Sequence, residues 1–169
     1  MTEESISREE AAWLAAIIEG EGSIHIARHK LSHGKITFRL AINVINTDCL
    51  MIKRVSELWY KLGCKFYYKI HNRQKKYPNS KIAMSIECVG RRSTDKIIDA
   101  IIPYLVTKRN QAELAKEFNH KMEEIFYQRM PVDEYVKIQI DFVDRLISMR
   151  LQTVNPQRLK RTASKPLEF

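Results

Sequence analysis

Two glutamates, Glu19 and Glu21, stand at the end of a predicted helix, where negative charge is unfavourable. They alternate with Gly20 and Gly22, and glycine commonly ends a helix because it adopts non-helical geometry without steric cost. The C-terminal end of a helix carries partial negative charge, so each carboxylate there costs about 0.3–1 kcal/mol unless a cation lies nearby. A divalent metal ion would be such a cation. The simpler alternative is a helix whose last residues are acidic and solvated.

The residues before these glutamates predict where the helix begins and how it packs. Ser7 and Glu10 have the S-x-x-E spacing of a capping box, so the helix is expected to start at Arg8. At 100° per residue it has a bulky apolar face and a face of small residues. The small face suits close approach of another backbone. The bulky face holds Trp13, Leu14, Ile17 and Ile18, and the small face holds Ala12, Ala15, Ala16 and Glu19.

The composition indicates one soluble domain. A chain of 169 residues with 44% hydrophobic residues is long enough to bury a single core. We expect a domain over residues 1–151 and a basic tail over residues 152–169. No apolar run is long enough to span a membrane, and the acidic first residues are unlike a signal peptide, so an intracellular location without a membrane partner is expected. The three cysteines lack the paired spacing of a zinc site or a disulfide framework.

Positive charge is concentrated in the first half of the chain. The net charge is +9, and residues 25–92 hold 15 of the 29 Lys and Arg but only three of the 20 acidic residues. The rest of the chain is therefore slightly acidic. Such asymmetry indicates a surface that binds a polyanion, and it argues against an evenly solvated basic surface.

The pattern of apolar residues predicts an α+β fold. Residues 24–43 and 65–88 alternate apolar and polar side chains, which indicates two antiparallel strand pairs. Helices are expected between them and at 94–102, 108–128 and 133–151, which gives the order αββαββα followed by C-terminal helices. The four-stranded sheet should have one apolar face and one polar face. Its polar side chains, the expected nucleic-acid contacts, are His25, His29, Lys35, Thr37, Arg39, Asn43, Lys65, Tyr67, Lys69, His71, Lys81 and Ser85.

The segment Leu14-Ala-Ala-Ile-Ile-Glu-Gly-Glu-Gly22, continued by Ser23-Ile24, resembles the LAGLIDADG motif of homing endonucleases. In that family two such helices pack side by side through their small faces, and the last acidic residue of each binds a catalytic divalent metal. The resemblance places the metal ligands at Glu21 and the adjoining Gly20. The chain departs from the motif in having Ala16 for the usual glycine and glutamate for both aspartates.

Two further segments resemble parts of the same family. Residues 103–112 resemble the segment whose lysine projects into the active site, which implies a catalytic role for Lys108. Residues 41–48 resemble the segment that supplies an active-site glutamine, and Asn46 stands in its place. The basic residue that often accompanies them has no secure counterpart, and Lys53 is only a candidate. The implied cofactor is Mg²⁺, with Mn²⁺ as a substitute.

The chain has only one such motif and no internal repeat, whereas the family's active site needs two acidic helix ends. A homodimer is therefore expected, with Ala12, Ala15, Ala16 and Glu19 at its interface. The resemblance implies an intron-encoded enzyme that makes metal-dependent double-strand breaks in a long, pseudo-palindromic DNA target. Two alternatives remain open: an intron maturase that binds RNA, and a sequence-specific DNA-binding protein without catalysis.

Overall fold

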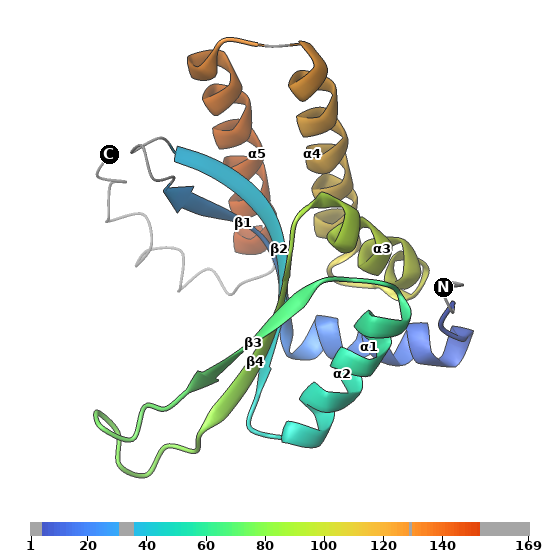
Figure 1. The fold of residues 1–169 in the computed structure, drawn as a ribbon, viewed down its shortest axis with the longest axis vertical. Coiled ribbons are helices and arrows are strands. Elements are labelled where there is room, and N and C mark those ends of the chain that lie inside the picture. Colours follow the sequence, from blue (N-terminus) through green and yellow to red (C-terminus); the bar gives the residue numbers. More distant parts are fainter. Residues whose placement is uncertain (1–4, 31–35, 129, 153–169) are drawn as a thin grey trace.

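The computed structural model describes residues 5–30, 36–128 and 130–152, and its element order confirms the predicted α+β fold. A four-stranded antiparallel sheet with strand order β1-β2-β4-β3 packs against helices (Figure 1). The elements are α1 (Arg8–Gly20), β1 (Gly22–Lys30), β2 (Ile36–Asn46), α2 (Cys49–Lys61), β3 (Phe66–His71), β4 (Ala83–Val89), α3 (Arg91–Ile101), the 3-10 helix η1 (Ile102–Tyr104), α4 (Arg109–Gln128) and α5 (Val132–Gln152). None of the described helices is long and apolar enough to cross a membrane.

Helix α1 begins as its sequence predicts. The Ser7 hydroxyl accepts a hydrogen bond from the Glu10 amide at 3.2 Å, and the Glu10 carboxylate accepts one from the Ser7 amide at 3.0 Å, which completes the capping box. The same carboxylate accepts hydrogen bonds from Lys61 and Arg54 of α2, each at 2.8 Å. These partners, Lys61 above all, lower the pKa of Glu10 to about 2. The start of α1 is thereby fixed to α2.

Strand register divides the sheet into an apolar and a polar face. Paired residues share a face, so the register of β1 on β2 and of β2 on β4 fixes which side chains lie together. The apolar face packs into the core with Leu14 and Ile18 of α1 and Trp59 of α2, and it includes Ile24, Leu40, Ile42, Val44, Ile86 and Cys88. The polar face holds Ser23, His25, Ala27, His29, Thr37, Arg39, Ala41, Asn43, Ile45, Tyr67, Lys69, His71, Ala83, Ser85, Glu87 and Val89.

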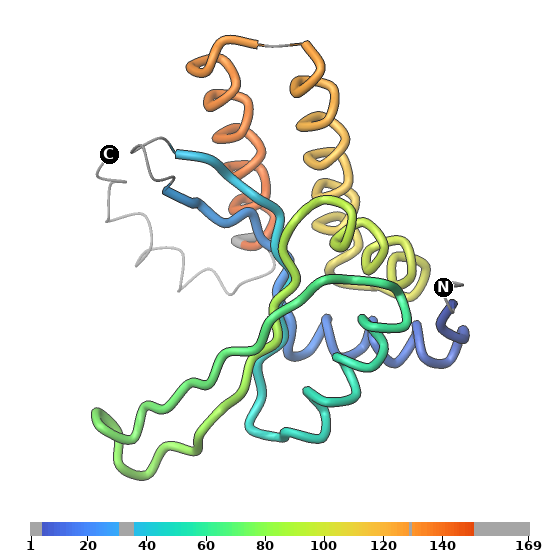
Figure 2. The backbone as a smooth tube through the Cα atoms, viewed as in Figure 1, coloured from blue at the N-terminus to red at the C-terminus, as the bar shows by residue number. Residues whose placement is uncertain are grey.

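The sheet is strongly twisted, and its two hairpins diverge. In Figure 1 the β1–β2 arm and the β3–β4 arm extend in different directions from the middle of the molecule, and the β3–β4 arm reaches beyond the helices. Helices α4 and α5 lie side by side as an antiparallel pair next to the β1–β2 arm. The tube in Figure 2 shows that α1 ends near the point where the two arms meet. The Glu19–Glu21 segment is therefore central in the molecule.

Some predicted boundaries differ from the observed ones. Helix α2 is capped by Asp48, whose carboxylate accepts from two amides of the first turn. Helix α3 begins at Arg91, three residues before the predicted start at residue 94, and it follows Gly90, whose φ of 99° few other residues adopt. Ser93 lies inside the helix, and its hydroxyl accepts a hydrogen bond from the Lys65 amide at 3.0 Å. The predicted sheet residues Lys65 and Lys81 are exposed and lie just before β3 and β4. Lys35 and the tail at 153–169 lie outside the described residues.

Candidate active site

Glu21 is exposed at the junction between α1 and β1, and its neighbours fix the backbone there. Its amide donates to the Ile17 carbonyl at 2.8 Å, as expected of a residue that closes a helix. A Cβ atom on Gly22 would approach the Ile18 Cα to 2.7 Å and the Ile18 carbonyl oxygen to 2.9 Å, so only glycine fits without movement. The turn from α1 into β1 is therefore tight, and it presents the Glu21 carboxylate at the surface.

Lys108, for which the resemblance implies a catalytic role, reaches this turn and binds its backbone. The ammonium Nζ donates to the carbonyl oxygens of Ile18 at 2.7 Å, Glu19 at 2.8 Å and Gly22 at 2.8 Å. It thereby places a positive charge at the negative end of α1. Burial lowers the pKa of Lys108, and the nearby Glu19 carboxylate opposes that shift. Lys108 lies beside the Glu21 turn and acts on it as a cap of the helix end.

Glu19 makes the converse contact with the start of α4. Its Oε1 accepts hydrogen bonds from the backbone amides of Val106 at 2.7 Å, Thr107 at 2.7 Å and Lys108 at 3.0 Å. Burial raises the pKa of Glu19, but the three hydrogen bonds outweigh it, and the pKa lies below its ordinary value. A carboxylate at the start of α4 also matches the positive end of that helix. Glu19 and Lys108 thus join α1 and α4 reciprocally.

This arrangement corrects one of the predicted dimer contacts. Ala15 is completely buried in the core of its own chain, so it is not available to a second copy. Glu19 is half-buried, with its Oε1 engaged by the start of α4, and its place in a dimer interface stays a prediction. The helical projection failed here because an alanine face is small enough to pack against the chain's own core.

The outward face of α1 instead follows Ala12, Ala16 and Gly20, spaced four residues apart, with Trp13 beside them. Ala16 and Gly20 are exposed, and Ala12 is half-buried. Trp13, predicted on the buried bulky face, is 36% exposed. A Cβ atom on Gly20 would meet nothing within 4 Å. Contacts within the chain therefore do not require a glycine at this position, in contrast to Gly22.

Asn46 is the last residue of β2. The register places Val44 opposite Gly22, so Asn46 lies two residues farther along β2, toward the end of α1. Its Oδ1 accepts from the Asp48 amide at 2.9 Å, which forms the turn into α2. That bond uses the carboxamide oxygen and leaves the Nδ2 group as the part of the side chain suited to donate to water or phosphate.

The donors near Glu21 fit a divalent metal only in part. Mg²⁺ is usually held by one or two carboxylates together with water and substrate phosphates. Glu21 supplies one exposed carboxylate per chain, and Gly20, the other predicted ligand, is exposed next to it. Among the described residues, no three His, Cys, Asp or Glu side chains come together as a metal site. The set fits Mg²⁺ if a second carboxylate and phosphate oxygens complete it.

The polar face brings together most of the residues predicted to contact nucleic acid. Arg39 and Lys69 are exposed on it, and the histidines on β1 are half-buried. The shared set is His25, His29, Thr37, Arg39, Asn43, Tyr67, Lys69, His71 and Ser85. The prediction that Ser85 contacts nucleic acid is wrong. Ser85 is only 5% exposed, and its hydroxyl is hydrogen-bonded to His71 Nε2 at 2.8 Å. Ser85 therefore orients His71 and is not itself positioned to touch a ligand.

Two residues at this face were not among the predicted site residues. Among the described strand residues of the polar face, Glu87 is the only acidic one. It lies opposite Tyr67, and burial together with the hydrogen bond to Glu87 raises the pKa of Tyr67 to about 12. Strand alternation was sufficient to place Glu87 there. Arg150 is the other: its Nη2 donates to the Ser23 hydroxyl at 2.9 Å and to the Ile24 carbonyl. No pattern in the sequence connects residue 150 with β1.

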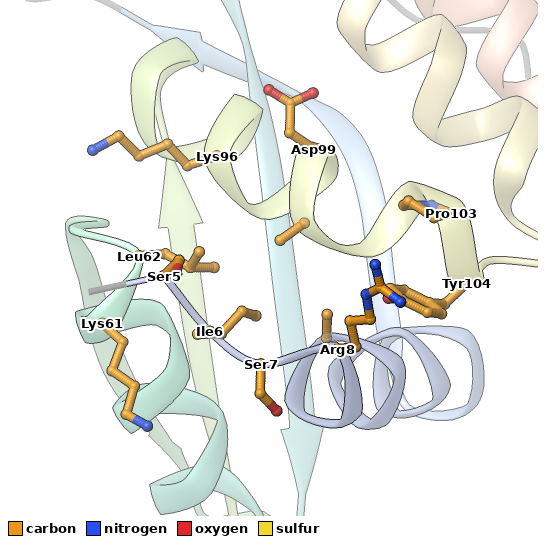
Figure 3. Close-up of a pocket in the computed structure, with 12 residues that line it drawn as sticks. Ser5, Ile6, Ser7, Arg8, Lys61, Leu62, Lys96, Asp99, Pro103 and Tyr104 are labelled. Carbon is orange, nitrogen blue, oxygen red and sulfur yellow. The ribbon is translucent and has the colours of Figure 1, made fainter. Parts of the chain in front are cut away.

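A cavity of about 500 Å³ lies elsewhere and contains none of these residues (Figure 3). It is bounded by the start of α1, the end of α2, and α3 with η1, and its lining includes Ile6, Leu62 and Tyr104. In Figure 3 the charged ends of Lys61, Lys96 and Asp99 point outward rather than toward one another. The cavity offers no convergent chemistry, and the candidate site remains the Glu21 turn with the polar face.

Comparison with solved structures identifies the architecture. The homing endonuclease I-CvuI, in complex with the I-CreI DNA target, superimposes with a TM-score of 0.62 at 20% sequence identity, over 84% of this chain and 82% of that one. The group I intron-encoded homing endonuclease I-CeuI, complexed with DNA, gives a TM-score of 0.62 at 19% identity, over 84% and 68%. The LAGLIDADG homing endonuclease I-GzeII, in complex with its DNA target, gives 0.55 at 15% identity, over 83% and 43%.

The chain has the LAGLIDADG homing endonuclease fold. No protein-family model matches the sequence, and no curated protein matches it. The similarity therefore lies in the three-dimensional arrangement. Within the LAGLIDADG fold, the motif helix predicted from residues 14–22 is α1, and the segment that resembles the lysine-bearing one leads into α4.

Proposed function

We propose that this protein is a site-specific DNA endonuclease that acts as a symmetric homodimer and uses divalent metal ions. The observation that carries the proposal is the position of Glu21: an exposed carboxylate on a sterically fixed turn, next to the polar face of the sheet. The structural neighbours I-CvuI and I-CeuI are homing endonucleases seen with DNA. I-CvuI is described with DNA in the presence of either 2 mM Mg or 2 mM Ca.

Dimerisation is supported by the surface of α1. Ala16 and Gly20 are exposed and Ala12 is half-buried, so the three form a surface stripe without bulky side chains, and the space beside Gly20 is open. A second α1 packed across a two-fold axis along this stripe would bring the two Glu21 residues close together. Two carboxylates would then face the DNA backbone, which is the donor set that one chain lacks.

The residues of the turn would divide the work of phosphodiester hydrolysis. A divalent ion held by Glu21 would supply positive charge for the phosphate and acidify nearby water. Lys108 holds the turn in place through the Ile18 and Gly22 carbonyls and adds a positive charge next to it. The Asn46 Nδ2 group would orient the attacking water or a phosphate oxygen. On the polar face, Arg39 and Lys69 suit guanine acceptor edges and Asn43 suits adenine, each good bidentate contact being worth about 1–3 kcal/mol.

The test is Mg²⁺-dependent cleavage of a plasmid library with randomised inserts and candidate intron-insertion junctions, using wild-type protein and Glu21→Gln. We expect site-specific double-strand breaks from wild type only, with DNA binding in Ca²⁺ retained by the variant. The matched control is Glu113→Gln, which changes an exposed glutamate on α4 and should cleave like wild type. Sedimentation velocity should give a dimer on the target DNA.

Two outcomes would contradict the proposal. Cleavage by Glu21→Gln at the wild-type rate would remove Glu21 from the reaction. An absence of cleavage by wild type, combined with tighter binding to folded intron RNA than to duplex DNA, would point to the maturase. The same absence with preferential binding of one duplex sequence would point to a DNA-binding protein without catalysis.

A further inference from the structure

Arg150 lies in the last turn of α5, more than one hundred residues from the Glu21 turn in sequence, yet it contacts the first residues of β1. Its Nη2 donates to the Ser23 hydroxyl at 2.9 Å and also to the Ile24 carbonyl oxygen. The side chain is half-buried, so its charge is directed into this junction rather than into solvent. Burial lowers the pKa of the Arg150 guanidinium, as expected of a cation removed from water.

The contact with Ile24 has a structural reason. Within the described sheet, β1 is an edge strand, and only its other side pairs with β2. Carbonyls on an open edge need a donor from outside the sheet. The Nη2 nitrogen of Arg150 carries two N–H groups, so this one nitrogen donates to the Ser23 hydroxyl and to the Ile24 carbonyl together.

Arg150 and Lys108 act on consecutive parts of one segment. Lys108 binds the carbonyls of Ile18, Glu19 and Gly22, before and after Glu21. Arg150 binds the next two residues along the chain. Burial is the main cause that lowers the pKa of Lys108, and the positive charge of Arg150 adds to it. Glu21 thus lies in a segment held by one cation from the start of α4 and another from the end of α5.

We propose that Arg150 is a positioning residue that, together with Lys108, clamps the segment 21–24 and so fixes where the Glu21 carboxylate stands. The clamp also joins the end of α5 to the junction of α1 and β1. Its consequence for DNA cleavage rests on the proposed function, whereas the clamp itself is a property of the folded chain. The role is distinct from contact with substrate, because the guanidinium acts through Ser23 and Ile24.

Hydrogen–deuterium exchange of the full-length protein tests the clamp without requiring activity. We expect Arg150→Gln to speed exchange of the amides in segment 21–25 by about tenfold while amides in the middle of α4 are unchanged, since local opening costs less free energy than global unfolding. Arg150→Lys, which keeps the charge on a shorter side chain, should give an intermediate rate. The matched control is Arg145→Gln on the same helix, which removes an ion pair with Glu117 and should leave this segment unchanged.

Cleavage then tests the consequence. If wild type cleaves DNA, Arg150→Gln should lower the single-turnover rate at least about tenfold and raise the Mg²⁺ concentration needed for half-maximal rate, with little change in DNA affinity in Ca²⁺. Exchange in segment 21–25 equal to that of Arg145→Gln would overturn the proposal, as would a wild-type cleavage rate in Arg150→Gln. If wild type cleaves nothing, the proposed function fails, and the exchange experiment alone decides the clamp.

Discussion

Replacing Lys108 by methionine should destabilise the protein strongly, because the ammonium is the donor to three carbonyls at the end of α1. Methionine has a similar length and keeps the apolar contacts of the stem, but it donates no hydrogen bond. The Ile18 residue is fully buried, so water cannot easily replace the lost donor at its carbonyl. The Glu19 and Gly22 carbonyls are more accessible, and hydration there should recover part of the loss.

The expected magnitude follows from these contacts. Leaving a buried carbonyl without a partner costs about 1–3 kcal/mol. Removing a cation from a partly buried helix C-terminus costs up to about 2 kcal/mol more. Allowing for hydration of the two accessible carbonyls, we expect a loss of about 3 kcal/mol in the free energy of unfolding, equivalent to a decrease in Tm of roughly 6–12 °C.

Urea unfolding at pH 7, followed by circular dichroism, measures this loss directly. The matched control is Lys116→Met, which removes an exposed ion pair between α4 and Asp99 and should cost no more than about 1 kcal/mol. If Lys108→Met loses no more stability than Lys116→Met, the three carbonyl contacts do not stabilise the fold and the reasoning is refuted. A decrease in the urea m-value would show instead that the variant has altered the compactness of one of its states.

The remaining predictions concern the polar face. Burial and the charge of Arg150 lower the pKa of His25 below 6.5, so below pH 6.5 the unfolded chain binds more protons than the native one. The free energy of unfolding should therefore decrease as the pH is lowered from 6.5. Urea unfolding of His25→Gln at several pH values should show a weaker dependence on pH. Glu87→Gln removes the negative charge from the polar face and should strengthen DNA binding by about 1 kcal/mol, or about fivefold, in fluorescence anisotropy at low salt. The same variant should shift the ultraviolet titration of Tyr67 from about 12 toward its ordinary value, and an unchanged titration would exclude Glu87 as a contributor.

Local signals in the sequence were sufficient for much of the fold. The capping box at Ser7 and Glu10 predicted the first residue of α1, because it depends on contacts only three residues apart. Strand alternation predicted the polar face from His25 to His71 for the same reason: the two-residue period of a strand is independent of the rest of the chain. The resemblance of residues 14–22 to a known motif then indicated Glu21 as the candidate metal ligand.

What could not be predicted depends on packing between distant segments. Ala15 and Ala16 are identical in type, yet one is buried in the core and the other is exposed, and only the position of the sheet decides between them. Ser85 is covered because His71 lies across the neighbouring strand. The contact of Arg150 with β1 requires knowledge of where α5 ends in space. Propensity and periodicity contain none of this information.

The reciprocal contacts of Glu19 and Lys108 also constrain when the protein can acquire its native centre during synthesis. Hydrogen bonds between these two segments join residues 86 to 90 positions apart, and those of Arg150 span 126 and 127 positions. When only the first strands of the nascent chain have emerged from the ribosome, the capping box of α1 can form. The hydrogen bonds from Lys108 to the end of that helix cannot form yet. Contacts of such long range slow folding, since the intervening chain must be ordered before they form. The acidic turn therefore reaches its final shape only after α4 and α5 have been made, although it precedes both helices in the chain.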